Sequence, residues 1–125
     1  MYKLFTVQEA KELIPVVDRH LRDMQDAIEE VSRGQGALET ARPLSITARN
    51  LQTDITFSLV SLQDSKAELD RLGVFLKDVD AGVIDFPSQV GAEVVYLSWR
   101  QGEPTITHYH RVVNDQALPL APVQS

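Results

Sequence analysis

The sequence predicts an α+β fold, in which a long antiparallel helical hairpin precedes a small antiparallel β-sheet of three to four strands. Two segments carry apolar residues at alternating steps of three and four, which is the spacing of one helix face. After Gly73 the spacing changes to the period-two alternation of strands. The length of 125 residues suits a single domain over residues 1–125. Within it we expect helices at 6–33 and 46–72, a sheet at 74–110 and an irregular tail at 111–125.

The composition excludes several classes of function. Lys and Arg total 12 against 18 Asp and Glu, giving a net charge of −6, which disfavours binding to nucleic acid or anionic lipid. The chain has no cysteine, so disulfides, thiolate metal sites and a cysteine nucleophile are excluded. No apolar run approaches the ~20 residues of a membrane span, and the first residues lack a signal-peptide core. We therefore expect a cytoplasmic protein without nucleic-acid or membrane partners.

The first helix begins at a capping box, in which Thr6 and Glu9 satisfy each other's backbone amides. Pro15 interrupts the pattern, so we expect either a kink or a second helix starting there. Gly34 is the expected end of the helix. Between these points one apolar stripe runs through Ile14, Val17, Leu21, Met24, Ile28 and Val31.

The second helix carries a matching stripe and ends at Gly73. Its members are Ala48, Leu51, Ile55, Ser58, Leu62, Ser65, Leu69 and Leu72. Two helices of similar length with a modest connection form an antiparallel hairpin, which buries only one stripe on each helix. We expect either a homodimer through these helices, or coverage of the stripe by the C-terminal sheet of the same chain.

The sheet is predicted from alternation and turn residues. The expected strands form two antiparallel hairpins, and they cover residues 74–79, 83–86, 93–99 and 104–110, with Pro87 stopping the second. If Gln101 and Gly102 are the central residues of the last turn, Glu93 lies opposite His110. In that register His108 and His110 share a face with Trp99.

His108 and His110 are the clearest candidates for chemistry. Their spacing places both imidazoles on one face of a strand, about 6–7 Å apart at the backbone. Two imidazoles and a nearby acid can bind a divalent ion such as zinc, cobalt, nickel, iron or manganese. The candidate acids are Glu93, from the expected register, and Asp85, Asp80 and Glu103. The alternative is a pair of exposed polar side chains at a sheet edge.

Two further polar groups lie at the expected turns. Asp78, Asp80 and Asp85 form either a carboxylate group for a cation or acid–base chemistry, or a hydrogen-bonded turn with Lys77 as an ion-pair partner of Asp85. Arg100 with Glu103 is either a functional ion pair or a surface pair beside the turn.

The same segments carry a family resemblance. Residues 73–87 read GVFLKDVDAGVIDFP, and residues 95–110 read VYLSWRQGEPTITHYH. With the pattern at residues 5–15, they resemble the bacterial domain of unknown function 2203 family. The resemblance implies a small cytosolic bacterial protein of unsettled activity, with some relatives labelled as cell-division proteins. It places in the family's motif blocks the residues Lys77, Asp78, Asp80, Gly82, Asp85, Pro87, Trp99, Arg100, Glu103 and His110. After His110 the chain departs from the family pattern, because residues 114–120 replace a glycine-rich, arginine-ending stretch.

The sequence supports two interpretations of function. The first is a protein that binds a divalent metal ion, either for binding alone or as a metal-dependent enzyme of unknown substrate. The second is a non-catalytic, homodimeric helical interaction module, in keeping with the cell-division label. Nothing in the sequence decides between catalysis and binding, and both interpretations stay open.

Overall fold

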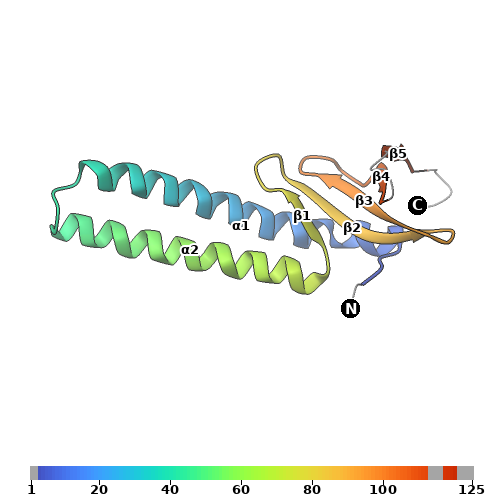
Figure 1. Ribbon diagram of the computed structural model, residues 1–125, viewed down its shortest axis with the longest axis horizontal. Helices are drawn as coiled ribbons and strands as arrows, with labels where there is room; N and C mark the ends of the chain where they lie inside the picture. The colour runs from blue at the N-terminus through green and yellow to red at the C-terminus, as the bar shows by residue number, and fades with distance from the viewer. Residues whose placement is uncertain (1–2, 113–116, 121–125) are drawn as a thin grey trace.

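A computed structural model describes residues 3–112 and 117–120 and shows a helical hairpin that projects from one end of a β-sheet (Figure 1). The helices are α1 (Val7–Thr40) and α2 (Ile46–Leu72). The five strands pair antiparallel in chain order, and they are β1 (Phe75–Asp78), β2 (Val83–Val90), β3 (Glu93–Arg100), β4 (His108–Arg111) and β5 (Ala117–Pro119). The predicted α+β class and hairpin are confirmed. The sheet has one strand more than expected, since part of the predicted irregular tail forms β5.

Helix α1 begins at the predicted capping box but does not end where expected. Thr6 N donates to Glu9 Oε1 over 2.9 Å, and Glu9 N donates to Thr6 Oγ1 over 3.0 Å. The helix then runs unbroken through Pro15 and Gly34 to Thr40, so an end at residue 33 and a second helix starting at Pro15 are wrong. Glycine suits position 34 of the helix because α2 lies close beside it: a Cβ atom there would lie 2.8 Å from Ile55 Cγ1. Packing between the helices therefore outweighs the local cost of these two residues.

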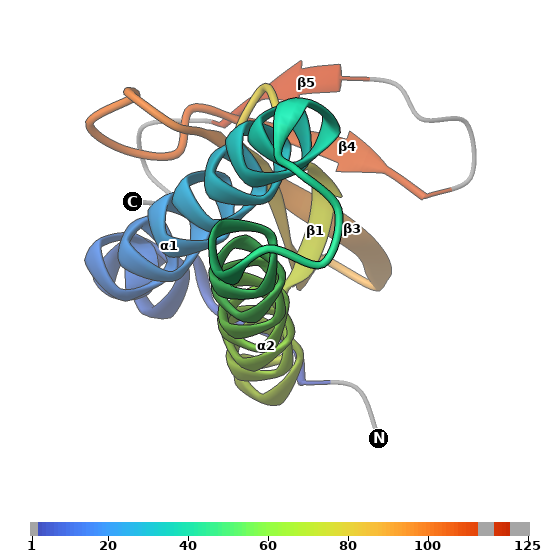
Figure 2. The same ribbon diagram turned by 90° about the vertical axis from the view of Figure 1, so that its left-hand side faces the viewer.

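Helix α2 follows the predicted bounds closely. Ser45 caps its first turn, and Gly73 ends it in the left-handed conformation, with φ of 88°. The two helices lie side by side along their lengths (Figures 1 and 2). No helix within the described residues is long and apolar enough to span a bilayer.

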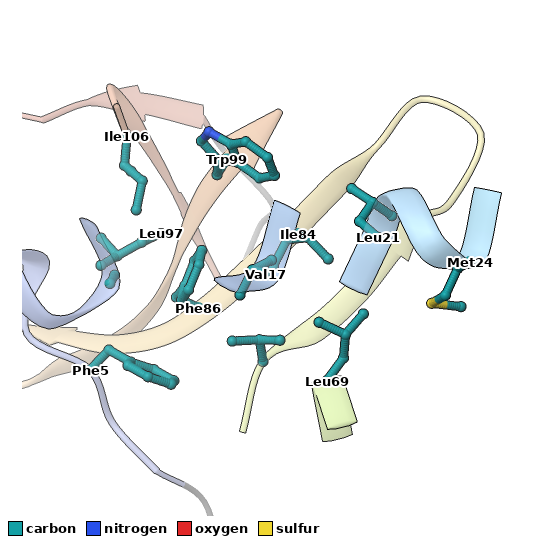
Figure 3. Close-up of a cluster of buried hydrophobic side chains, with 12 residues drawn as sticks. Phe5, Val17, Leu21, Met24, Leu69, Ile84, Phe86, Leu97, Trp99 and Ile106 are labelled. Atoms are coloured by element: carbon teal, nitrogen blue, oxygen red, sulfur yellow. The ribbon is translucent and has the colours of Figure 1, made fainter. Parts of the chain in front are cut away.

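The hydrophobic core lies where the hairpin meets the sheet. Val17 and Leu21 of α1 and Leu69 of α2 are buried against strand residues that include Phe86 and Trp99 (Figure 3). This end of the helical stripe is thus covered by the sheet of the same chain. The homodimer expected through the helices stays a prediction.

Strand β2 continues past Pro87, contrary to the expected stop at residue 86. The carbonyl of Pro87 accepts from Phe5 N over 2.7 Å, on the side of β2 that faces away from β3. The N and C=O of a strand residue point to the same side, so the missing N–H of Pro87 removes no bond of the β2–β3 ladder. Proline is accepted here because the side of β2 that faces away from β3 borders only the N-terminal segment at this point, and not another strand of the sheet.

The β3–β4 register differs from the expected one. Tyr96 lies opposite His110 and Ser98 lies opposite His108, so Glu93 does not face His110. The strands are joined by the seven residues 101–107 rather than by a two-residue turn. This shift is an odd number of residues, so the two histidines lie on the opposite face from Trp99.

Candidate functional site

The sheet has an inner face against the helices and an outer face that carries a polar pocket. Phe86, Leu97 and Trp99 are buried on the inner face, so their strand neighbours point outward. The pocket has a volume of about 480 Å³. Its walls come from the edge strands, the central strands and one turn, and its lining residues are Lys77, Asp78, Val83, Ser98, Arg100, Glu103, His108, His110 and Ala117.

One row of paired residues runs across the sheet and enters this pocket. Asp85 lies opposite Ser98, and Ser98 lies opposite His108, so the three side chains follow one another across β2, β3 and β4. Asp85 is only 7% exposed. Its Oδ1 and the Nδ1 of His110 are both buried atoms. The small side chain of Ser98 thus lies between an acid and an imidazole.

The carboxylates at the rim of the pocket fix the two turns beside it. Asp78 Oδ1 accepts from Ala81 N over 3.0 Å. Glu103 Oε1 accepts from Arg100 N over 2.7 Å, and its carbonyl accepts from Trp99 Nε1 over 2.9 Å. Among the residues that the structure describes, the guanidinium of Arg100 makes no ion pair, and the residue is exposed. The hydrogen bond from its backbone N–H to Glu103 therefore fixes Arg100 beside the pocket, while its guanidinium donors are exposed to solvent.

Helix α1 supports the two hairpin turns from behind. Gln25 Nε2 donates to the carbonyl of Val79 over 2.9 Å and to Gln101 Oε1 over 2.8 Å. Gln101 Nε2 donates in turn to Asp18 Oδ1 over 3.1 Å. Gly82 is required here, because its φ is 72° and a Cβ atom would lie 2.6 Å from Gln101 Cβ. These contacts hold the turn after β1 and the turn after β3 in a fixed relation.

Most of the polar residues singled out from the sequence meet in this pocket. The structure brings together Lys77, Asp78, Arg100, Glu103, His108 and His110, while Asp85 is not a lining residue and lies opposite the lining residue Ser98. Asp80 is exposed in the turn and is not among the lining residues. Trp99 is 2% exposed in the core, while Gly82 and Pro87 serve the backbone.

Glu93 belongs to a different interaction. It receives two hydrogen bonds from Arg111, of 2.8 Å from Nε and 3.0 Å from Nη2. The hydrogen bond from Arg111 lowers the pKa of Glu93, and the same bond raises the pKa of Arg111. Glu93 therefore joins β3 to β4 at the far end of the strand, and its predicted place opposite His110 is wrong.

Three lining residues were missed from the sequence, namely Val83, Ser98 and Ala117. Ser98 alternates with the apolar residues Leu97 and Trp99, which is a signal that it points away from the core. Placing it beside His108 needs the true length of the β3–β4 connection. Ala117 lies in β5, in a tail where no strand was expected.

The described residues contain no group of three or more His, Cys, Asp and Glu side chains arranged to hold a metal ion. His108 Nδ1 lies 2.8 Å from the hydroxyl of Thr107, so this imidazole already has one local partner. The two imidazoles share the pocket with carboxylates at its rim, but these groups do not form a ready coordination sphere in the described part of the chain.

Comparison with known proteins gives one match. The family described as "Uncharacterized conserved protein (DUF2203)" matches residues 3–116. Neither the curated proteins nor the solved structures contain a match to the chain.

Proposed function

We propose that this chain, which belongs to the DUF2203 family of uncharacterised conserved proteins, binds a small organic anion in the pocket on the outer face of its sheet. One observation carries the proposal. Four nitrogen-bearing side chains from three strands line a single pocket, and they are Lys77, Arg100, His108 and His110.

The charge of the pocket contrasts with that of the chain. The whole protein has a net charge of −6, whereas the pocket lining balances Lys77 and Arg100 against Asp78 and Glu103 and adds two imidazoles. The rim carboxylates of Asp78 and Glu103 each accept a backbone N–H, so one oxygen of each is engaged by its own turn. Arg and Lys donors recognise the oxygens of carboxylate and phosphate groups. The arrangement therefore favours an oxyanion as ligand.

An NMR titration tests this proposal. Inorganic phosphate and acetate are added to ¹⁵N-labelled protein, and the amide signals of residues 77, 98–100 and 108–110 are expected to shift together, with a millimolar dissociation constant typical of small ions. Replacing Arg100 with Gln removes a charged donor and is expected to weaken binding about tenfold or more. Arg42→Gln, at an exposed site in the loop that connects α1 to α2, serves as the matched control. Shifts that are absent, or unchanged by Arg100→Gln, overturn the proposal.

A divalent metal is a second candidate, favoured by the two imidazoles in one pocket. His108 and His110 share it with the carboxylates of Asp78 and Glu103. An ion held by two imidazoles takes its remaining ligands from water or from a bound anion. Elemental analysis of untagged protein is expected to find a transition metal in the parent and none in a His108→Ala/His110→Ala variant. Metal-free parent protein after incubation with zinc or manganese overturns this candidate and leaves the anion proposal intact.

A further inference from the structure

An apolar groove lies next to the polar pocket on the outer face of the sheet. It has a volume of about 470 Å³ and is lined by Leu4, Phe75, Pro87, Val94, Tyr96 and Val112. Several of these side chains are strongly exposed for their type, with Phe75 at 40%, Val94 at 45% and Val112 at 51%. A contiguous group of exposed apolar side chains is typical of a ligand-binding groove or of a surface that binds a protein or a membrane.

The strand register makes the groove and the pocket continuous. Tyr96 of the groove lies opposite His110 of the pocket, and it is two residues from Ser98 on the same strand. Phe75 lies opposite Asp85, which in turn lies opposite Ser98 of the pocket. Residues two apart on a strand share a face, so the polar row gives way to the apolar row without a change of surface.

The aromatic pair at the junction gives the groove a defined wall. The rings of Phe75 and Tyr96 meet edge to face, with centroids 5.8 Å apart and an interplanar angle of 82°. Tyr96 is half-buried, so the pair is held against the sheet. An extended apolar chain leaving the pocket would therefore pass directly over these rings.

We infer that the ligand is amphipathic: its anionic head occupies the pocket at Lys77 and Arg100, and its hydrocarbon tail lies in the groove over Phe75, Tyr96 and Val94. The inference rests on the proposed anion site and names the class of its ligand. Ser98 and Val94 are four residues apart, which corresponds to about 14 Å along the strand. An extended hydrocarbon chain with C–C bonds of ~1.5 Å is a zigzag that advances about 1.25 Å per bond, so this length accommodates a chain of about twelve carbon atoms.

Calorimetric titration with straight-chain carboxylates tests the inference. Acetate, butyrate, hexanoate, octanoate, decanoate, dodecanoate and tetradecanoate are each titrated into the full chain. A fully buried methylene contributes about fourfold in affinity, so we expect about twofold per methylene in this open groove. The gain is expected to level off beyond about twelve carbons, where the groove ends.

Two variants separate the head site from the tail site. Val94→Asn is expected to flatten the dependence on chain length while leaving acetate binding unchanged, and Val60→Asn on α2 is the matched control at a similarly exposed valine. Arg100→Gln is expected to weaken every carboxylate by a similar factor. 1-Octanol, which has the tail without the charge, is expected to bind at least tenfold more weakly than octanoate.

The outcomes distinguish the two proposals. Equal affinity for acetate and octanoate overturns the inference but leaves the anion site standing. Absence of binding by the whole series overturns both proposals. If octanol binds as tightly as octanoate, the groove binds the hydrocarbon tail without any contribution from the anion site. This result overturns the inference that one ligand occupies both. If the parent protein has the mass of a dimer in solution and Val94→Asn has the mass of a monomer, the groove binds a second copy of the chain. This result also overturns the inference.

Discussion

Ser98 of β3 lies directly opposite His108 of β4, with Asp85 of β2 opposite Ser98 on its other side. The hydroxymethyl group of Ser98 is the smallest side chain of these three, and it lines the pocket. The free space between the acid and the imidazole therefore depends on the size of the residue at position 98. This relation gives a way to close the pocket without changing any of its charges.

Ser98→Leu is expected to fill the pocket and weaken anion binding about tenfold or more, because a larger apolar side chain excludes the ligand and its water. Since the side chain points away from the core, we expect unfolding free energy to change by less than about 1.5 kcal/mol. Ser98→Ala removes the hydroxyl without filling the space and is the control. Anion titration and urea unfolding measure the two effects. Full binding by the Leu variant contradicts the assigned pocket.

Trp99 is expected to act through stability and not through ligand contact. Its indole is 2% exposed, and its Nε1 donates to the carbonyl of Glu103. Trp99→Ala is expected to lower the unfolding free energy by about 3–5 kcal/mol, as for other buried aromatic residues. Trp99→Phe keeps most of the apolar volume and is expected to lose less. Urea unfolding followed by circular dichroism measures both, and an unchanged midpoint in the Ala variant would contradict the core assignment.

The ion pair between Glu93 and Arg111 predicts a pH dependence of stability. The hydrogen bond from Arg111 holds the pKa of Glu93 below its value in the unfolded chain. Stability from this pair is therefore present above the unfolded pKa, which is about 4.3 for Glu, and is lost as pH falls from there through the lower folded pKa. Glu93→Gln is expected to flatten the curve of melting temperature against pH in this window. Glu39→Gln, at an exposed site near the end of α1, is expected to retain the parent slope.

Local patterns in the sequence predict most of the elements of this fold. The capping box at Thr6, the stripe that buries Leu21 and Leu69, and the left-handed cap at Gly73 each depend on residues close together in the chain. The predicted end of α1 is wrong, because Gly34 lies inside the helix at a point where Ile55 of the other helix leaves no room for a side chain. Such a contact between distant residues leaves no local signal.

The candidate site was predicted in its residues but not in its pairing. His108 and His110 share a face, as their spacing requires, and the polar residues of both motif blocks converge on them. Glu93 was misplaced because pairing depends on the length of the β3–β4 connection. A shift by an odd number of residues exchanges the faces of a strand. The expected two-residue turn therefore places the histidines on the face of Trp99, whereas the observed seven-residue connection places them on the opposite face.

The homodimer expected from the sequence stays a prediction, and an exposed stripe on α2 gives its test. Ile46, Phe57 and Val60 are 77%, 70% and 48% exposed, and their spacing places them on one side of the helix. If two chains pair through this stripe, Phe57→Glu is expected to keep the helical circular dichroism and halve the mass measured by light scattering. Gln52→Glu, about 120° around the helix from Ile46, is the control. A monomeric parent chain excludes the dimer.

The most direct test of the account is a crystal structure of the chain with decanoate. The account predicts carboxylate density within hydrogen-bonding distance of the Arg100 guanidinium and hydrocarbon density running over Tyr96 toward Val94. Density for the carboxylate at any other surface, or an empty pocket at a ligand concentration that saturates the protein in solution, would contradict it.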